Sequence, residues 1–311
     1  MFLDLKMTSK IHKFLLTWLL TKQVTGLAES SNLDMAPNAF DDQYEGCVQE
    51  MEEKAPQLLK EDFNMSEQLK VEWKKADQHW KKIKNKMSYP EGFHDFHGTA
   101  LVAYTGDIHR DFNRAVREFR KNFHNFPYKA FHYYLTRALQ LLHNKNCYTV
   151  YRGTKTKFLY RGKGSVRFGQ FASSTSAKAV AVSKSFLSNH GTLFSIETCL
   201  GVDIKEFSFL SNEKEVLIPG YEVYQKVKAR QIGKGYDGYY EISLDSPQRK
   251  KSNFNCFYSN STDIVSSHLS SSGGRDSPAL LLLVVLPGLL VRLLALAECS
   301  NSFPAVHGSE C

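Results

Sequence analysis

Two glutamates separated by one residue, Glu213 and Glu215, are the side chains whose types and spacing best suit chemistry. They precede the apolar run Val216-Leu217-Ile218, so we expect an extended segment in which both carboxylates face one side, with about 7 Å between their Cα atoms. One carboxylate can stabilise an oxocarbenium-like cation at a sugar carbon, and the other can orient or deprotonate the incoming nucleophile. Taken alone, the pair also fits an exposed strand edge, because acidic side chains mostly face solvent.

The elements that must position these acids change in character along the chain. Apolar residues at spacings of three and four predict amphipathic helices over residues 66–87, 108–123 and 129–142. After Cys147 the sequence is rich in β-branched and aromatic residues broken by glycine, which is typical of strands. Strands are predicted over 148–151, 166–171, 193–196, 216–218, 221–227 and 239–244, with one helix over 177–187. Helices followed by strands, without regular βαβ alternation, indicate an α+β fold.

The first 28 residues have the layout of a secretory signal. Basic residues precede the apolar run 14–20, and small residues follow at Gly26 and Ala28. We therefore expect residues 1–28 to be removed during export. The folded domain that remains is expected to cover residues 29–272.

Residues 273–311 predict attachment to a membrane. Ser271 or Ser272 supplies the small attachment residue of a glycosylphosphatidylinositol (GPI) anchor, residues 275–278 form a polar spacer, and residues 279–297 are almost entirely apolar. The short spacer and the polar tail after the apolar run leave a membrane-spanning helix as the alternative, since about 19 apolar residues approach the needed length. In both cases we expect the domain on the extracellular face of the cell membrane.

Four cysteines remain between the two processed ends, namely Cys47, Cys147, Cys199 and Cys256. An even number in an exported chain predicts two disulfides, with three possible pairings that the sequence does not separate. Asn64 and Asn260 each begin an Asn-x-Ser/Thr sequence and are predicted glycosylation sites. No Cys-x-x-Cys spacing occurs, and histidines such as His94 and His97 have no acidic partner at ligand spacing, so no metal site is expected.

Several other functions are excluded by composition or spacing. The net charge of +8 is mildly basic and could attract a phosphate-bearing ligand, but no nucleic-acid-binding module occurs. Residues 233–238 match the dinucleotide fingerprint in letters, but a predicted strand follows, so we expect a hairpin turn. Residues 162–165 lack the spacing of a phosphate-binding loop, and no Gly-x-Ser-x-Gly elbow of serine hydrolases is present.

Three segments follow one another in the second half: Tyr151-Arg152-Gly153, the serine-rich residues 171–176, and Glu213-Lys214-Glu215. An arginine ending one strand, a serine cluster ending a second and a Glu-x-Glu at a third resemble the signature of the animal ecto-mono-ADP-ribosyltransferases. The four cysteines, the phrase Val216-Leu217-Ile218-Pro219-Gly220 and both processed ends also resemble that family, most closely its T-cell surface members. The resemblance covers residues 36–257.

This resemblance implies a fold, disulfides and partners. The family fold is the α+β fold of ADP-ribosylating toxins, with an amino-terminal helical part packed on two β-sheets whose junction forms an NAD cleft. The family pairing implies the disulfides Cys47–Cys256 and Cys147–Cys199, the first of which would clasp the ends of the domain. NAD is the implied co-substrate and protein arginine side chains are the implied acceptors, with no metal and no nucleic acid involved.

The resemblance also assigns roles around the cofactor. Arg152 would bind the NAD pyrophosphate through its planar cation, and Gly153 would let the dinucleotide approach the backbone. Ser173 would hold the catalytic acid in place by hydrogen bonding. Phe186 is similar to a family aromatic residue that stacks near the nicotinamide.

Glu215 and Glu213 would then divide the chemistry between them. Glu215 would stabilise the oxocarbenium as nicotinamide departs, and Glu213 would decide which acceptor captures it. Within the family, glutamine at position 213 goes with NAD hydrolysis and glutamate with arginine modification. We therefore expect an NAD–protein-arginine ADP-ribosyltransferase that inverts the anomeric carbon, with side NAD glycohydrolase activity. The alternatives are an enzyme that mainly hydrolyses NAD, and a catalytically silent surface protein that only binds a partner.

Overall fold

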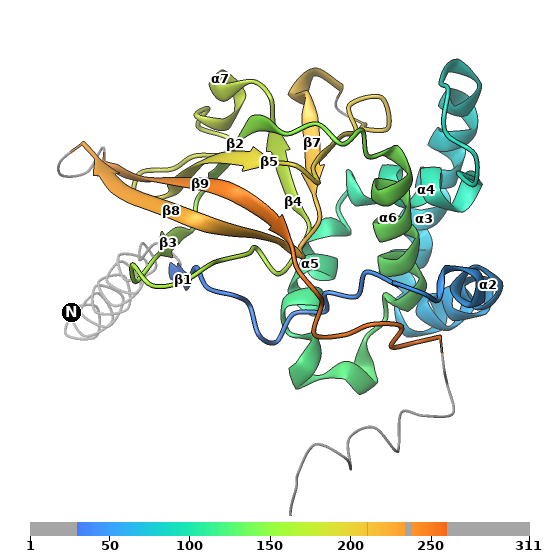
Figure 1. The fold of residues 1–311 in the computed structure, drawn as a ribbon. Helices are drawn as coiled ribbons and strands as arrows, with labels where there is room; N and C mark the ends of the chain where they lie inside the picture. Colours follow the sequence, from blue (N-terminus) through green and yellow to red (C-terminus); the bar gives the residue numbers. More distant parts are fainter. Residues whose placement is uncertain (1–29, 210, 234–237, 260–311) are drawn as a thin grey trace, which may run out of the picture. The chain divides into compact units, whose positions relative to one another are not determined.

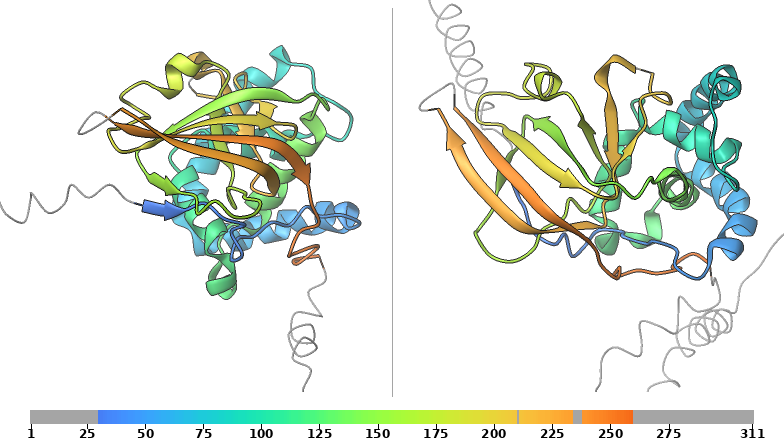
Figure 2. Two further views of the ribbon diagram at one scale, coloured as in Figure 1. Left: turned by 60° about the vertical axis from the view of Figure 1, so that its left-hand side comes forward. Right: turned by 45° about the horizontal axis from the view of Figure 1, so that its top comes forward.

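The structure is a computed structural model that describes residues 30–209, 211–233 and 238–259. A group of helices lies beside a twisted sheet, and the β8–β9 hairpin lies on the side of the sheet away from the helices (Figures 1 and 2). No helix within the described ranges is long and apolar enough to cross a membrane. The expected signal, the expected anchor and Asn260 lie outside the described residues.

The helical part contains five α-helices within the described residues: α2 (Val48–Met65), α3 (Glu67–Ile83), α4 (Asp95–Tyr104), α5 (His109–Arg117) and α6 (Lys129–Leu142). The predicted helices over 66–87 and 129–142 are confirmed, and Ser66 caps α3 by accepting a hydrogen bond from the Leu69 N–H at 3.1 Å. The helix predicted over 108–123 ends at Arg117 and continues as the short 3-10 turns η2 (Phe119–Lys121) and η3 (Phe123–Asn125).

Most strands of the described chain belong to one sheet of seven strands, in the order β6-β7-β4-β2-β5-β9-β8. These are β2 (Tyr148–Thr154), β4 (Ala172–Thr175), β5 (Thr192–Thr198), β6 (Val202–Asp203), β7 (Glu215–Ile218), β8 (Glu222–Ile232) and β9 (Tyr239–Arg249). The parallel pair β1 (Ser30–Asn32) and β3 (Lys157–Leu159) forms a separate small sheet. The α+β class is confirmed, and the antiparallel pairing of β8 with β9 confirms the predicted hairpin.

Two predicted elements are wrong in extent. Residues 166–171 do not form a strand: Val166 makes an isolated bridge to Tyr224, and Gly169 has φ of +64°, a left-handed conformation that turns the chain before β4. The helix predicted over 177–187 is a single turn, α7 (Lys178–Ala181), followed by further turns rather than continuous helix.

Strands β2 and β4 are barely joined. Their ladder consists of one register pair, Tyr151 with Thr175, whereas β2 and β5 pair from Tyr148 with Thr198 to Thr154 with Thr192. The single sheet is therefore close to two sheets that share one point of contact. This arrangement corresponds to the two sheets with a junction that the family resemblance implies.

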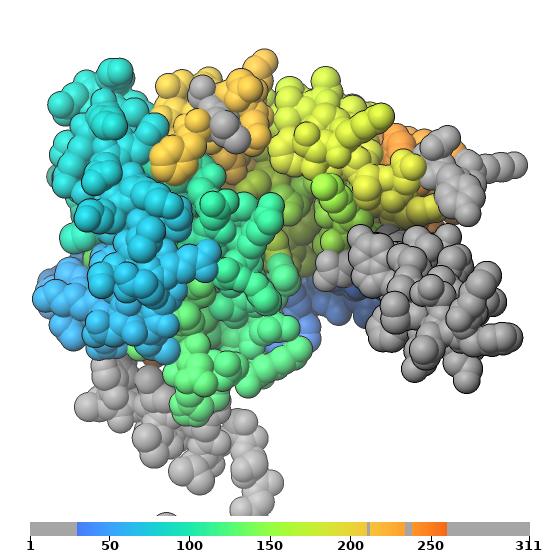
Figure 3. Space-filling model, turned by 180° about the vertical axis from the view of Figure 1, so that it is seen from behind, coloured from blue at the N-terminus to red at the C-terminus, as the bar shows by residue number. Residues whose placement is uncertain are grey.

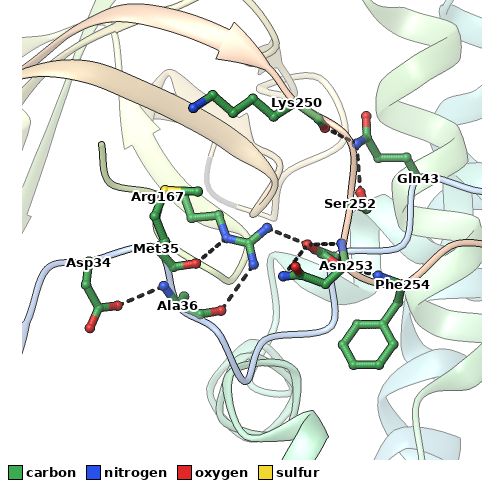
Figure 4. A network of polar contacts seen from close by, with 10 residues as sticks. Asp34, Met35, Ala36, Gln43, Arg167, Lys250, Ser252, Asn253 and Phe254 are labelled. Carbon is green, nitrogen blue, oxygen red and sulfur yellow. Dashed lines mark hydrogen bonds and ion pairs between the residues drawn. The ribbon is translucent and has the colours of Figure 1, made fainter. Parts of the chain in front are cut away.

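A buried ion pair ties the first described residues to the last ones. Arg167 donates to the Asp41 carboxylate at 2.5 Å, and both side chains are almost completely buried. The same carboxylate accepts the backbone N–H groups of Asn253 and Phe254 at 2.9 to 3.0 Å (Figure 4). Segments more than 200 residues apart in sequence thus share one carboxylate.

Both disulfides implied by the family resemblance are present. Cys47 and Cys256 have Cα atoms 6.0 Å apart, and Cys147 is bonded to Cys199. The first bond spans a sequence separation of 209 residues, so the chain-entropy model gives a stabilisation of about 5 kcal/mol. The Cys256 N–H donates to the carboxylate of Asp42 at 3.0 Å, so the disulfide joins the same two segments as the ion pair.

Asp41→Asn should destabilise the fold strongly. The change leaves the Arg167 guanidinium buried without its counter-charge, which typically costs about 3–5 kcal/mol. Chemical denaturation of the purified protein measures the loss. The matched control is Glu45→Gln, which breaks the exposed pair with Arg249 and should cost under about 1 kcal/mol. Equal losses for the two variants would contradict the structural importance of the buried pair.

Candidate active site

A pocket opens where β2 and β4 part. Its lining residues are Tyr151, Arg152, Gly153, Ser173, Ser174, Thr175, Val180, Ala181, Phe186, Glu213 and Glu215. All six residues expected to bind the dinucleotide or act on it are among them. In Figure 3 the pocket lies in the hollow between the yellow α7 segment and the gold loop that precedes β7, with yellow-green strands at its floor.

Arg152 lies on β2 directly after the single pair with β4. Its guanidinium donates a hydrogen bond to the Ser173 carbonyl. Burial lowers the pKa of Arg152, while the neighbouring Tyr104 and Glu215 raise it. The arginine also lines a second, larger cavity of about 570 Å³. Its cation therefore lies between two adjoining spaces.

Gly153 is required by packing inside the protein. A Cβ atom there would lie 2.0 Å from the carbonyl oxygen of Ala181 and 3.2 Å from Cβ of Phe186. The absence of a side chain thus lets the α7 segment close against β2, which differs from the expected approach of a dinucleotide to the backbone. Phe186 forms part of the pocket wall with 36% of its surface exposed, so its ring is available to a ligand.

The two glutamates do not share a strand, so the extended segment predicted for them is wrong. Glu213 ends the 3-10 turn η4 (Ser211–Glu213), Lys214 has φ of +49°, and β7 begins at Glu215. The Thr175 hydroxyl donates to the Glu213 carbonyl at 2.8 Å, and this bond holds the turn over the end of β4. Both acids nevertheless line the pocket, because the left-handed turn redirects the chain between them.

Glu215 is a buried acid whose pKa is shifted by its neighbours in both directions. Burial raises its pKa, and the charge of Glu213 raises it further. Hydrogen bonds with the side chains of Ser173 and Ser208, together with the Arg152 cation, lower it. The ionised carboxylate is therefore poorly solvated and sensitive to each neighbouring charge, as expected of a group that responds to a developing cation.

Tyr104, at the end of α4, was not predicted as a site residue. Its hydroxyl donates to the Phe171 carbonyl at 3.0 Å, accepts from Asn113 Nδ2 at 3.0 Å, and is hydrogen-bonded to the Ser173 side chain. Tyr104 thereby links the helical part to the serine that contacts Glu215. A buried tyrosine hydroxyl usually has such a partner, and the apolar run before Tyr104 was the signal of its burial.

Other predicted sites lie away from the pocket. Asn64 is exposed at the end of α2, so its amide is accessible to modification. The expectation that His94 and His97 lack an acidic partner is wrong, because Glu52 from α2 lies beside both. Within the described residues, this group is separate from the residues that line the pocket.

The site combines a fixed cation, hydroxyl donors, two carboxylates and an aromatic wall. A guanidinium binds phosphate oxygens with two parallel hydrogen bonds, and an exposed aromatic face accommodates a flat ring. A desolvated carboxylate stabilises a positive centre more strongly than it would in water. The pocket is thus suited to a ligand with a flat ring, a sugar and a phosphate.

Comparisons with known proteins agree with this chemistry. Residues 33–252 match the family model described as NAD:arginine ADP-ribosyltransferase. T-cell ecto-ADP-ribosyltransferase 2 of mouse is 68% identical over 94% of this chain and 100% of its own length. T-cell ecto-ADP-ribosyltransferase 1 of mouse is 64% identical with the same coverage.

Solved structures give the same result. The crystal structure of the eukaryotic mono-ADP-ribosyltransferase ART2.2 is 68% identical, with a TM-score of 0.69 over 73% of this chain and 99% of its own. Variants of ART2.2 in complex with NADH and with NAD show the same TM-score. The extent of the family model and the identity to these relatives show that the chain belongs to the NAD:arginine ADP-ribosyltransferase family.

Proposed function

We propose that this chain is an extracellular enzyme that transfers ADP-ribose from NAD to arginine side chains of surface and secreted proteins. The reaction inverts the anomeric carbon and is accompanied by slow hydrolysis of NAD. A GPI anchor holds the enzyme at the cell membrane. The observation that carries the proposal is the convergence of Arg152, Ser173, Glu213 and Glu215 on one pocket.

The two adjoining cavities suit the two ends of a dinucleotide. The pocket beside Phe186 is the smaller of the two, about 60 Å³ against about 570 Å³, and its aromatic wall suits a flat ring such as nicotinamide. Arg152 stands where this pocket meets the larger cavity, a position suited to the pyrophosphate. Arg117 and Lys121 line the larger cavity and add positive charge for the remaining nucleotide.

Glu215 is the group that makes bond cleavage possible. The glycosidic bond to nicotinamide breaks, its electron pair leaves with the neutral base, and positive charge develops on the ribose. The ionised Glu215 stabilises this charge, and Ser173 and Ser208 hold the carboxylate by hydrogen bonds. At about 4 Å such attraction is worth about 4 kcal/mol in a partly closed site, against ~1 kcal/mol in bulk water.

Glu213 selects the group that captures the cation. An arginine guanidinium is almost always protonated and is a poor nucleophile until a proton is drawn off. Glu213 lies on the turn above β4, half-buried at the pocket, where its carboxylate can accept that proton. The guanidine nitrogen then bonds to the face opposite the departing nicotinamide, which gives the inverted product.

Glu213→Gln should separate transfer from hydrolysis. With labelled NAD and agmatine as acceptor, labelled agmatine should fall roughly 100-fold because general-base assistance is lost, while nicotinamide release persists. The contrasting variant Glu215→Gln should lose both products, by about 100-fold or more. If Glu213→Gln transferred ADP-ribose as well as the unmodified enzyme, the assigned role of Glu213 would be wrong. If the unmodified enzyme released nicotinamide without labelling agmatine, the glycohydrolase alternative would replace the transferase.

Glu213→Gln should also shift the pH dependence of NAD hydrolysis. Glu215 must be ionised to act, so activity falls as the pH drops through its raised pKa. The charge of Glu213 is one cause of that rise, and its removal should move the acid limb of kcat/KM to lower pH. An acid limb that stays in place or moves to higher pH would show that another group controls it.

Tyr104→Phe should lower kcat for NAD hydrolysis roughly 3- to 10-fold, because the hydroxyl that positions Ser173 is lost. KM should change little, since Tyr104 is buried behind the serine and does not line the pocket. The matched control is Tyr134→Phe, which removes a buried hydroxyl with no hydrogen-bond partner among the described residues. Equal effects of both variants on kcat would assign Tyr104 a purely structural role.

A further inference from the structure

A second group of titratable side chains lies outside the pocket. Glu52 of α2 faces His94 and His97, which stand three residues apart at the start of α4. The carboxylate lies 3.0 Å from Nε2 of His94 and 3.4 Å from Nε2 of His97. The mechanism uses none of these residues.

One atom of this group is unsatisfied. His97 is fully buried, and its Nε2 has no hydrogen-bond partner among the described residues, although it points at the Glu52 carboxylate. Buried ring nitrogens normally have a partner. Glu52 and His94 also line an open surface cavity, so a small ion can reach the group from solvent.

We propose that Glu52, His94 and His97 bind one Zn²⁺ ion. Two imidazole nitrogens and one carboxylate oxygen form a donor set typical of zinc sites that keep a fourth position for water. Ligand atoms around a tetrahedral zinc with bonds of 2.0–2.1 Å lie about 3.4 Å apart. Oε2 of Glu52 lies 3.0 Å from His94 Nε2, its Oε1 lies 3.4 Å from His97 Nε2, and one ligand atom from each of the three residues lies within 4.8 Å of the others. A small shift of these side chains would bring one carboxylate oxygen and both ring nitrogens around one ion. The fourth position faces the surface cavity.

The charges of the group favour a cation. Burial raises the pKa of Glu52, but the hydrogen bond from His94 and the nearby ring of His97 outweigh it and hold the pKa well below its usual range. Burial lowers the pKa of His97 and so disfavours the charged form of its ring. Helix α6 contributes Tyr133 and Tyr134 beside Glu52 and the more distant Arg137 cation near His97.

Zinc binding has a cost that sets the affinity. Nδ1 of His97 accepts the His94 N–H at 3.2 Å, and Nδ1 of His94 accepts the Phe96 N–H at 3.3 Å, so both rings carry their proton on Nε2. Zinc takes the Nε2 position and moves that proton to Nδ1, which breaks both long capping bonds at the start of α4. Each lost cap lowers the affinity roughly fivefold to tenfold, so we expect a Kd on the order of micromolar.

Calorimetric titration of the purified, tag-free protein with ZnCl₂ tests the site. We expect one equivalent to bind at pH 7.5, and roughly 10-fold weaker binding at pH 5.5 because the imidazoles must lose protons. Glu52→Gln and His94→Gln should each weaken binding roughly 100-fold, whereas His124→Gln, at an exposed histidine outside the group, should bind as the unmodified protein does. Saturating zinc should also raise the Tm of the unmodified protein and not that of Glu52→Gln.

Three outcomes would overturn the proposal. One is the absence of saturable binding up to about 1 mM zinc, which is beyond any specific site of this kind. Another is undiminished binding by folded Glu52→Gln and His94→Gln, which would place the ion elsewhere. The third is loss of binding in His124→Gln alone. Circular dichroism of each variant shows whether the protein has kept its overall helix content.

Discussion

The early parting of β2 and β4 is the constraint on which the site depends. Beyond the pair of Tyr151 with Thr175, β2 and β4 no longer form backbone hydrogen bonds with each other. The backbone polar groups along their facing edges therefore need other partners. The Arg152 guanidinium takes the place of a neighbouring strand by donating to the Ser173 carbonyl. The separation of β2 from β4 thus explains both the pocket and the position of the Arg152 guanidinium in it.

A series of hydrogen bonds connects the helical part to the catalytic acid in the gap between β2 and β4. Tyr104 ends a helix that is buried on nearly all sides. Its hydroxyl is hydrogen-bonded to the Phe171 carbonyl, just before β4, and to the Ser173 side chain. Ser173 in turn holds Glu215, whose charge is opposed by burial and by Glu213. Such a carboxylate is costly in a folded protein, and the surrounding hydrogen bonds offset part of that cost.

The sequence predicted elements with a clear local pattern and failed where distant contacts decide. Helix α3 has an amphipathic stripe, whereas α4 is buried all round and shows none, so it was missed. The left-handed turn at Lys214 depends on hydrogen bonds from β4, which no local pattern reports. Arg152, Ser173 and Glu215 were identified through their family signature, but Glu52 meets His94 only through folding, 42 residues away.

The disulfide Cys47–Cys256, which joins the two ends of the domain, also determines which elements bear a pulling force applied at the carboxyl end. A pull on the chain beyond Ser259 reaches Cys256 before it reaches β9, and the disulfide passes the load to Cys47 at the start of α2. The pulling force therefore does not separate β9 and β8 from the edge of the sheet. Any tether at the carboxyl end pulls on covalent bonds and a helix, so tension on the tether bypasses the sheet that carries the pocket.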